Sequence, residues 1–201
     1  MFPLGAAVPD AVTIAIISDT HGYLDHRIAE VISNCDLAIH AGDIGNNAVL
    51  QQMTPRSGRV FYVQGNNDTP ARWPEAEHPV LAALCEQQTL QLPGGAIAVE
   101  HGHRVWDTHR YHQRLRKRHP HARAIVYGHT HRRVCDTQEV PWVINPGAAG
   151  RNRTFGGPSC LVLTVAGDKW RVRKCCFDPM PRGSKRRTRN GAMLKNAALT
   201  G

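Results

Sequence analysis

Residues 12–22 read VTIAIISDTHG, a continuous apolar run that ends in a polar turn with an aspartate, a histidine and a glycine. A short run rich in β-branched residues is typical of a strand that is buried on both faces. The next stretch, HRIAEVIS at 26–33, has apolar residues at helical spacing. The same pattern of a buried strand followed by a polar loop recurs at 36–43 and 58–68. Three such units predict βαβ organisation and a largely parallel first sheet.

The second half of the chain has a different pattern. Residues 89–103, TLQLPGGAIAVEHGH, predict a hairpin that turns at Pro93-Gly94-Gly95. Residues 108–120 predict a basic, exposed helix that ends at a proline, and several short strands follow it. The whole pattern therefore indicates an α/β fold with two mixed sheets packed face to face and helices outside.

Composition indicates a single soluble domain. A chain of 201 residues can bury a core without disulfides, and no apolar run approaches the ~18 residues of a membrane span. No Lys or Arg precedes the first apolar stretch, so we expect no signal peptide. The six cysteines, at positions 35, 85, 135, 160, 175 and 176, form no CxxC motif and no regular framework. Reduced thiols and a cytoplasmic location are the simplest interpretation.

The net charge of +9 is concentrated at the C-terminal end. Residues 169–201 hold ten Lys or Arg and one acid, whereas residues 1–168 hold 15 of each sign. We therefore predict a domain at 1–179 and a basic, flexible tail at 180–201. Binding of nucleic acid is an expectation only for this tail, and no membrane partner is expected.

Polar residues follow each buried strand, mostly beside a glycine. In open α/β sheets such loops converge at the carboxyl ends of the strands, where ligands bind. The segments are Asp19-Thr20-His21, Gly42-Asp43, Gly65-Asn66-Asn67-Asp68, His101-Gly102-His103 and Gly128-His129-Thr130-His131. In the DTH and GHTH segments, two candidate ligands stand one residue apart. On an extended chain both would point to the same side.

Carboxylates and imidazoles without thiolates suit a transition metal such as Mn, Fe, Zn or Ni. The seven candidate ligands are too many for one ion, and they suit two ions about 3.5–4 Å apart with a shared carboxylate. They are Asp19, His21, Asp43, Asn66, His101, His129 and His131. A single aspartate at a strand end is more often a turn or helix cap, and a single histidine is more often a surface residue. The ordered set of five loops favours the metal site over these alternatives.

The motifs DTHG, GDIGN, GNND, HGH and GHTH, in this order, resemble the calcineurin-like metallophosphoesterase superfamily. The ISDTHG start and the INPGAAGRNR segment most resemble its YfcE-type phosphodiesterase branch. The resemblance covers about residues 12–176 and implies a four-layer α/β/β/α sandwich.

The resemblance also implies a role for each candidate ligand. Asp19, His21, Asp43 and His131 would hold one ion, and Asp43 would bridge to a second ion held by Asn66, His101 and His129. The ions would be two divalent metals, with Mn²⁺ expected first and Fe, Ni or Zn as alternatives.

Further residues receive catalytic roles from the same comparison. Arg153 would bind phosphate, with Arg151 as a competitor, and His103 would assist. Asp68 would orient the loop or a histidine that lies behind the metal ligands. Many superfamily members have a proton-donating histidine where this chain has Asn67, which is no general acid at neutral pH. We therefore expect dependence on metal activation and on good leaving groups.

The predicted function is metal-dependent hydrolysis of a small-molecule phosphate ester, as a phosphodiesterase that uses a metal-bridging hydroxide. Three alternatives remain open. One is a non-catalytic scaffold of the same fold, as in a retromer subunit that has lost some metal ligands. Another is a phosphomonoesterase or nucleotide phosphatase, and the third is an RNA-directed protein that uses its basic tail. The oligomeric state, physiological substrate and native metal are not predicted.

Overall fold

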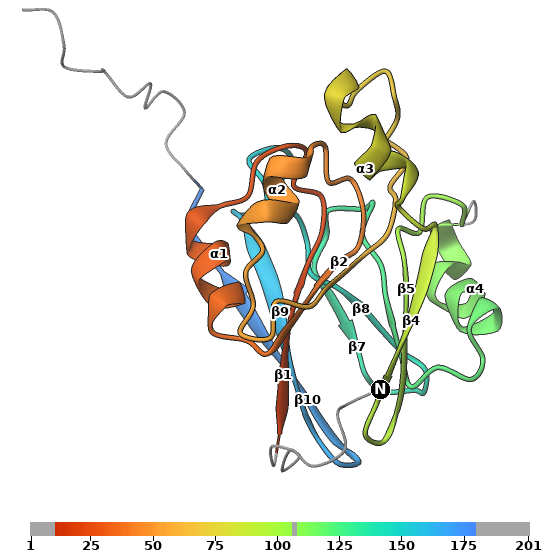
Figure 1. Ribbon diagram of the computed structural model, residues 1–201. Coiled ribbons are helices and arrows are strands. Elements are labelled where there is room, and N and C mark those ends of the chain that lie inside the picture. Colours follow the sequence, from red (N-terminus) through yellow and green to blue (C-terminus); the bar gives the residue numbers. More distant parts are fainter. Residues whose placement is uncertain (1–10, 106–107, 180–201) are drawn as a thin grey trace, which may run out of the picture.

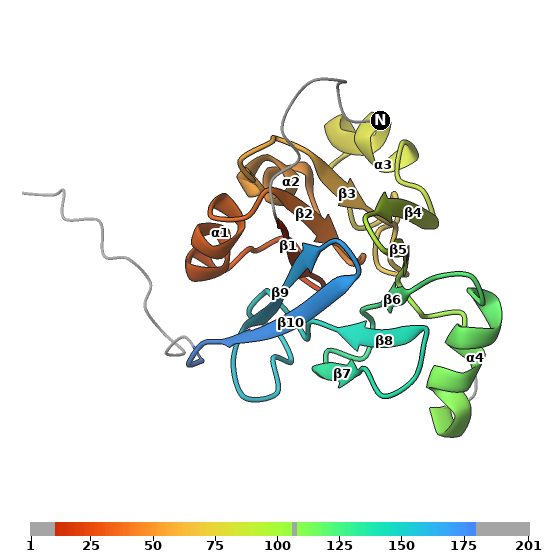
Figure 2. The ribbon, with the colours of Figure 1, turned by 90° about the horizontal axis from the view of Figure 1, so that it is seen from below.

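The computed structural model describes residues 11–105 and 108–179, so the predicted tail at 180–201 lies outside the described residues. Two five-stranded sheets pack face to face, and helices cover their outer faces (Figures 1 and 2). This arrangement confirms the predicted four-layer α/β/β/α sandwich. No helix in the described ranges is long and apolar enough to cross a membrane.

The first sheet has the strand order β10-β9-β1-β2-β3. Strands β1, β2 and β3 are parallel. Strand β9 pairs with β1 in antiparallel fashion, and β10 pairs with β9 in antiparallel fashion. The predicted parallel sheet is therefore correct for its first three strands, and the last two strands make the sheet mixed. The strands are β1 (Val12–Ile17), β2 (Leu37–His40), β3 (Val60–Tyr62), β9 (Ser159–Ala166) and β10 (Lys169–Cys176).

The second sheet has the order β4-β5-β6-β8-β7. Its three central strands are parallel, and β4 and β7 pair with them in antiparallel fashion at the two edges. The strands are β4 (Gln87–Leu92), β5 (Gly95–Glu100), β6 (Ala124–Val126), β7 (Val134–Asp136) and β8 (Trp142–Asn145). The predicted hairpin is confirmed, because β4 and β5 are joined at Pro93-Gly94.

Helices lie on the outer faces, α1 and α2 beside the first sheet and α4 beside the second (Figure 2). They are α1 (His26–Ser33), α2 (Asn47–Gln52), α3 (His78–Ala82) and α4 (Tyr111–Arg118), with 3-10 turns η1 (Glu75–Glu77) and η2 (Thr108–Arg110). Helix α1 has the predicted bounds, because Asp25 caps its first turn by accepting a hydrogen bond from Arg27 N at 3.0 Å. Helices α2 and α3 are too short to show a helical period. The βαβ pattern predicted a helical stretch between β2 and β3 without bounds, and α3 was not predicted.

Alternate residues of the buried strands face different cores. Ile14 and Ile16 of β1 point between the sheets, where they pack with Ile97 and Val126 of the second sheet. Ala15 and Ile17 of the same strand pack against α1 on the other face. A third apolar cluster, which includes Leu115 of α4, covers the outer face of the second sheet. Strands that are buried on both faces account for the continuous apolar runs in the sequence.

Candidate metal centre

The polar loops after β1 and β2 meet at one edge of the first sheet. The backbone N–H of Asp19 donates to the carbonyl of Gly42 at 3.0 Å, and that of His21 donates to the carbonyl of Asp43 at 2.9 Å. Because β1 and β2 are parallel, their carboxyl ends lie side by side and these bonds continue the ladder into the loops. The pairing of the strands therefore places the aspartate-histidine turn directly against Asp43.

Five of the seven candidate ligands have left-handed backbone. The φ angles are 55° for Asp19, 47° for His21, 57° for Asp43, 65° for His129 and 57° for His131. Only two other non-glycine residues in the described ranges, Arg153 and Phe155, have positive φ. The prediction of an extended chain in these segments was therefore wrong. Each such residue costs of order 1–3 kcal/mol, and a concentration of them is typical of functional sites.

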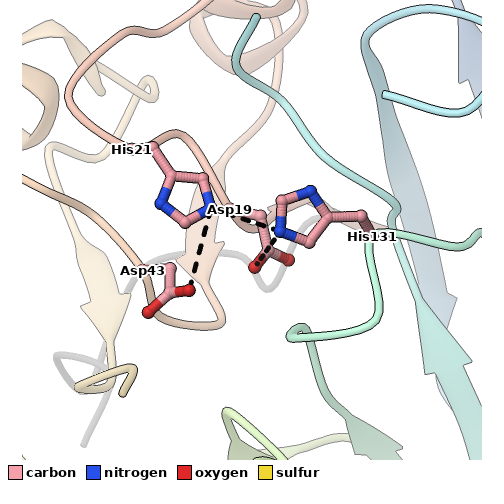
Figure 3. Close-up of side chains that lie close together, drawn as sticks. All are labelled: Asp19, His21, Asp43 and His131. Carbon is pink, nitrogen blue, oxygen red and sulfur yellow. Dashed lines mark hydrogen bonds and ion pairs between the residues drawn. The ribbon is translucent and has the colours of Figure 1, made fainter. Parts of the chain in front are cut away.

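One set of side chains is tightly grouped (Figure 3). Asp19, His21, Asp43 and His131 each offer one ligand atom, and these atoms all lie within 4.8 Å of one another. His131 Nε2 lies 3.2 Å from Asp19 Oδ1, and the two histidine rings stack with their centroids 5.1 Å apart. Three of the four side chains are buried, and His21 is half-buried. We call this set the inner group.

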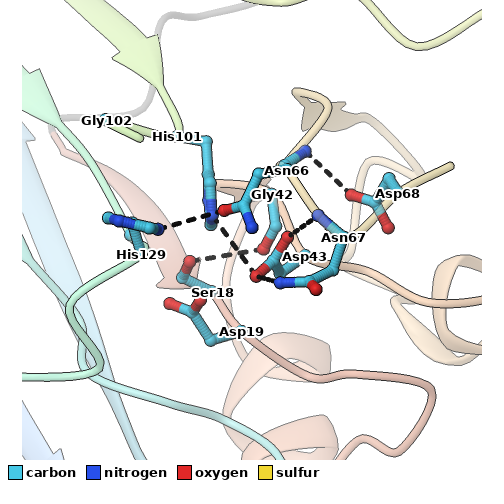
Figure 4. Close-up of polar contacts among 12 residues, drawn as sticks. Ser18, Asp19, Gly42, Asp43, Asn66, Asn67, Asp68, His101, Gly102 and His129 are labelled. Carbon is cyan, nitrogen blue, oxygen red and sulfur yellow. Dashed lines mark hydrogen bonds and ion pairs between the residues drawn. The ribbon is translucent and has the colours of Figure 1, made fainter. Parts of the chain in front are cut away.

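The other predicted ligands lie close to Asp43 (Figure 4). His101 Nε2 is 3.4 Å from Asp43 Oδ2, and His129 Nδ1 is 3.0 Å from Asn66 Oδ1. The rings of His101 and His129 meet edge to face at 5.3 Å. His101 is buried, whereas Asn66 and His129 are exposed. We call His101, His129 and Asn66 the outer group.

The inner and outer groups contain buried polar atoms without a hydrogen-bond partner. These atoms are Oδ1 and Oδ2 of Asp19 and Nε2 of His101. The other ring nitrogen of His101, Nδ1, donates to the carbonyl of Ala41 at 2.7 Å, and Nε2 faces Asp43 Oδ2 at 3.4 Å. Burial alone would lower the pKa of His101, but the Asp43 carboxylate outweighs burial and raises that pKa. An unpartnered buried carboxylate is costly, and a bound cation would satisfy it. The donor set therefore fits divalent metal ions.

The electrostatics of the site keep these ligands ready for a cation. Partial desolvation of the ring lowers the pKa of His21 and of His129, so both imidazoles are neutral at pH 7. Burial alone would raise the pKa of Asp43, but His101 and the hydrogen bonds from Asn67 outweigh it and hold that pKa below its ordinary range. Neutral imidazoles and ionised carboxylates are the forms that bind metal.

Asn67 is turned toward Asp43. Its backbone N–H donates to Asp43 Oδ1 at 2.8 Å, and its side-chain amide donates to Asp43 Oδ2 at 2.6 Å. Two donors from one residue fix the orientation of the carboxylate that stands between the inner and outer groups. The residue in the position of the family's proton donor therefore orients a candidate ligand in this chain.

Asp68 is fully buried and ties neighbouring loops together. Its carboxylate accepts hydrogen bonds from the backbone of Ile44, Gly45 and Gly65 at 2.9–3.1 Å and from the Trp73 indole at 3.0 Å. With four donors, its lone pairs are fully used. The structure shows Asp68 holding the loop after β2 against the loop after β3.

The two candidate phosphate-binding arginines lie in different surroundings. The guanidinium of Arg153 is 3.1 Å from His131 Nε2, at the edge of the inner group. The guanidinium of Arg151 instead lies over the ring of Tyr23, 3.5 Å from its centroid. His103 lies beside the outer group, with its ring 5.5 Å from that of His101. Its Nδ1 atom is buried without a partner.

Two further polar residues support the site, and the sequence analysis did not assign them a role. Asn145, at the end of β8, donates to the carbonyl of Gly128 at 2.7 Å and to Thr130 Oγ1 at 3.2 Å, which holds the GHTH loop. Ser18 donates to the carbonyl of Ala41 at 3.2 Å. Both residues are fully buried polar groups at the end of an apolar strand, and that position in the sequence was the available signal.

A family model for the calcineurin-like phosphoesterase superfamily domain matches residues 12–168. The chain belongs to this superfamily. A probable metallophosphoesterase from Mycoplasma pneumoniae is 28% identical over 141 residues, which cover 67% of this chain and 77% of that protein. A phosphodiesterase from Methanocaldococcus jannaschii is 27% identical over 146 residues, which cover 67% of this chain and 82% of that protein. At the level of the superfamily, the chain is a phosphoesterase with a candidate site for divalent metal.

Solved structures share the fold at low sequence identity. A conserved protein from Streptococcus pneumoniae, a predicted phosphoesterase, aligns with a TM-score of 0.59 and 21% identity over 88% of this chain and 96% of its own. Wild-type Vps29 from Entamoeba histolytica, solved as a zinc complex, aligns with a TM-score of 0.62 and 16% identity over 83% of this chain and 98% of its own. These likenesses establish the two-sheet fold.

Proposed function

We propose that the protein is a dinuclear metal-dependent phosphodiesterase that acts on a small-molecule phosphate ester. The observation that carries this proposal is the inner group, whose four ligand atoms lie within 4.8 Å of one another, with the outer group beside it. In these groups the buried Asp19 oxygens and His101 Nε2 have no hydrogen bond. A site built only for folding would satisfy these atoms within the protein.

The inner group would hold one ion through Asp19, His21, Asp43 and His131. The outer group would hold the second ion, with Asp43 shared because it lies next to both His21 and His101. When bound, two divalent ions neutralise charge on the phosphate and acidify a water nucleophile. We expect Mn²⁺ to serve, with Fe, Ni and Zn as alternatives.

The remaining side chains have separate roles in this proposal. Arg153 would contact a phosphate oxygen from the edge of the inner group, which favours it over Arg151, whose guanidinium lies over the Tyr23 ring. His103 would donate a hydrogen bond from the outer side. Asp68 would position the loops without exchanging a proton. Asn67 supplies no general acid, so the best substrates would have leaving groups that depart without protonation.

The test is hydrolysis by the full-length protein after metal removal and reconstitution with Mn²⁺. We expect bis(p-nitrophenyl) phosphate to be hydrolysed faster than p-nitrophenyl phosphate, and the metal-free protein to be inactive. The matched control is the Asp43→Asn variant carried through the same reconstitution. Equal turnover by this variant and the native protein would falsify the proposal, whereas a preference for the monoester would revise it to a phosphomonoesterase.

Metal content alone does not separate the enzyme from a scaffold of the same fold. One Vps29 protein that shares this fold was solved with zinc, so binding of zinc by this chain would fit either function. Turnover is therefore the deciding measurement. A protein that binds two ions and hydrolyses no phosphate ester across a substrate panel would support the scaffold.

A further inference from the structure

Two cysteines stand opposite each other on the antiparallel strands β9 and β10. Cys160 and Cys175 are direct partners in the register of this pair. The Cα atoms of such partners are about 4.5–5.5 Å apart. This spacing falls within the roughly 4.4–6.8 Å that a disulfide spans. Because they are directly opposed, both side chains point to the same face of the sheet.

The two thiols meet in a buried setting beneath α1. Cys160 is fully buried and Cys175 is 7% exposed, and both belong to the apolar cluster between α1 and the first sheet. The register of β9 and β10 and the shared cluster thus place the two cysteines side by side, which is the arrangement needed for a bond between them.

A positively charged side chain contacts one of the two sulfur atoms. The guanidinium of Arg173 donates to Cys175 Sγ at 3.0 Å, from two residues earlier on the same face of β10. A cation beside a thiol favours the thiolate, which is the reactive form. The neighbouring Cys160 thiol and the charge of Arg173 lower the pKa of Cys175, and the Cys175 sulfur raises the pKa of Cys160. The pair is therefore asymmetric, with Cys175 as the nucleophile.

A cavity lies beside this pair and is lined by the arginine that contacts Cys175. The cavity, of about 380 Å³, lies between α1 and the strands, and its lining includes Arg173, Cys35 and Asn34. A hydroperoxide needs far less space than this. The cavity brings solvent to the guanidinium that contacts Cys175.

We propose that Cys160 and Cys175 form a peroxide-reactive dithiol that closes to a disulfide between β9 and β10. The Cys175 thiolate attacks the O–O bond of a hydroperoxide ROOH and becomes a sulfenic acid, while RO⁻ leaves and takes a proton to form ROH. The Cys160 sulfur then attacks the sulfenic sulfur, its proton passes to the departing hydroxide, and water leaves. Two thiols are oxidised by two electrons, and the peroxide is reduced. This chemistry requires neither the metal centre nor the proposed hydrolysis.

Other cysteines of the chain do not share this geometry. Cys176 is the next residue on β10, so it points to the opposite face, and it is exposed. Cys85 is exposed outside the named strands, and Cys135 belongs to the second sheet. Cys35 lies in the same apolar cluster but precedes β2, so strand pairing does not place it opposite Cys175.

The experiment uses the full chain with Cys85→Ser and Cys176→Ser, which removes the exposed thiols and leaves four of the six cysteines. After exposure to hydrogen peroxide, we expect thiol titration in denaturant to show two fewer thiols. We expect peptide mapping to identify a disulfide between Cys160 and Cys175. The Arg173→Gln variant should react about tenfold more slowly, because it has less thiolate. Arg171→Gln, on the same strand, should react at the native rate.

A second variant tests the order of the steps. In Cys160→Ser, the sulfenic acid on Cys175 has no partner, so a dimedone adduct should accumulate there and the disulfide should be absent. A disulfide from Cys175 to Cys35 would overturn the assignment of the partner. Four titratable thiols after peroxide treatment of the folded protein would overturn the proposal as a whole.

Discussion

The inner and outer groups of the candidate centre each contain two histidines and differ in enclosure. The inner group has its ligand atoms within 4.8 Å of one another, and three of its four side chains are buried. The outer group has one buried histidine, and its two other members, Asn66 and His129, are exposed. A buried, pre-arranged set of charged ligands loses little conformational entropy when it binds an ion, whereas exposed side chains must first be ordered.

The difference indicates that the two ions would be held unequally. The inner group contributes two carboxylates and two imidazoles, whereas the outer group contributes an amide and two imidazoles and shares Asp43. More negative charge and deeper burial favour the inner position. The outer ion would therefore exchange more readily, and the outer position would be the more open one to substrate.

The largest expected effect comes from Asp43, which is common to both groups. Asp43→Asn removes the charge that faces His21 and His101, so the binding of both ions should weaken. We expect kcat/KM for bis(p-nitrophenyl) phosphate to fall by at least about 10³-fold. The control is Asp36→Asn at the opposite end of β2, where the carboxylate accepts hydrogen bonds from Thr13 at 2.7 and 2.8 Å. Activity above a tenth of native in Asp43→Asn would contradict the shared role.

The next largest expected effect is a difference in metal binding between variants of the two histidines of the GHTH segment. His131→Ala removes a buried inner ligand, and we expect the affinity for the tighter ion to fall by about 100-fold. His129→Ala should leave one tightly held ion per chain after dialysis and lose the other. Metal analysis by mass spectrometry measures both, with exposed His26→Ala as the control. Equal ion content in the two variants would remove the distinction between the groups.

A third expected effect concerns the loop that carries Asn66. Asp68→Asn replaces a carboxylate that accepts four hydrogen bonds with an amide whose NH₂ group opposes those donors. We expect the free energy of unfolding to fall by about 2–3 kcal/mol. Denaturant unfolding measures this, with Asp168→Asn in the exposed β9–β10 turn as the control. If Asp68 serves the outer group through its loop, dialysed Asp68→Asn should also lose the weaker ion first.

The residue types of this centre were predictable from local sequence and their division into two groups from the family resemblance, whereas their backbone conformation was not predictable. An apolar strand that ends in Asp, Asn or His can be recognised from the local sequence alone. This pattern identifies all seven candidate ligands. The left-handed backbone of residues such as Asp19 and His131 was not predicted, since it depends on hydrogen bonds between loops that are distant in sequence. The pairing of Cys160 with Cys175 has the same origin. It follows from the register of β9 and β10, which cysteine spacing does not reveal.

The smallest expected effect tests what Asn67 does between the two groups. Asn67→Ala removes the amide that donates to Asp43 Oδ2 at 2.6 Å and keeps the backbone donor at 2.8 Å. We expect kcat/KM to fall about tenfold, the size typical of a lost partner of a metal ligand. Because the amide orients Asp43 and transfers no proton, the loss should be equal for p-nitrophenyl and alkyl leaving groups.

The control for this variant is Asn46→Ala, which removes the side-chain acceptor that caps α2 at Val49 N and should affect stability more than turnover. A larger loss for the alkyl leaving group than for p-nitrophenol would show that Asn67 assists departure of the leaving oxygen. In that case the residue would act on the substrate. Equal losses would place its action on Asp43, the carboxylate that separates the buried inner group from the open outer group.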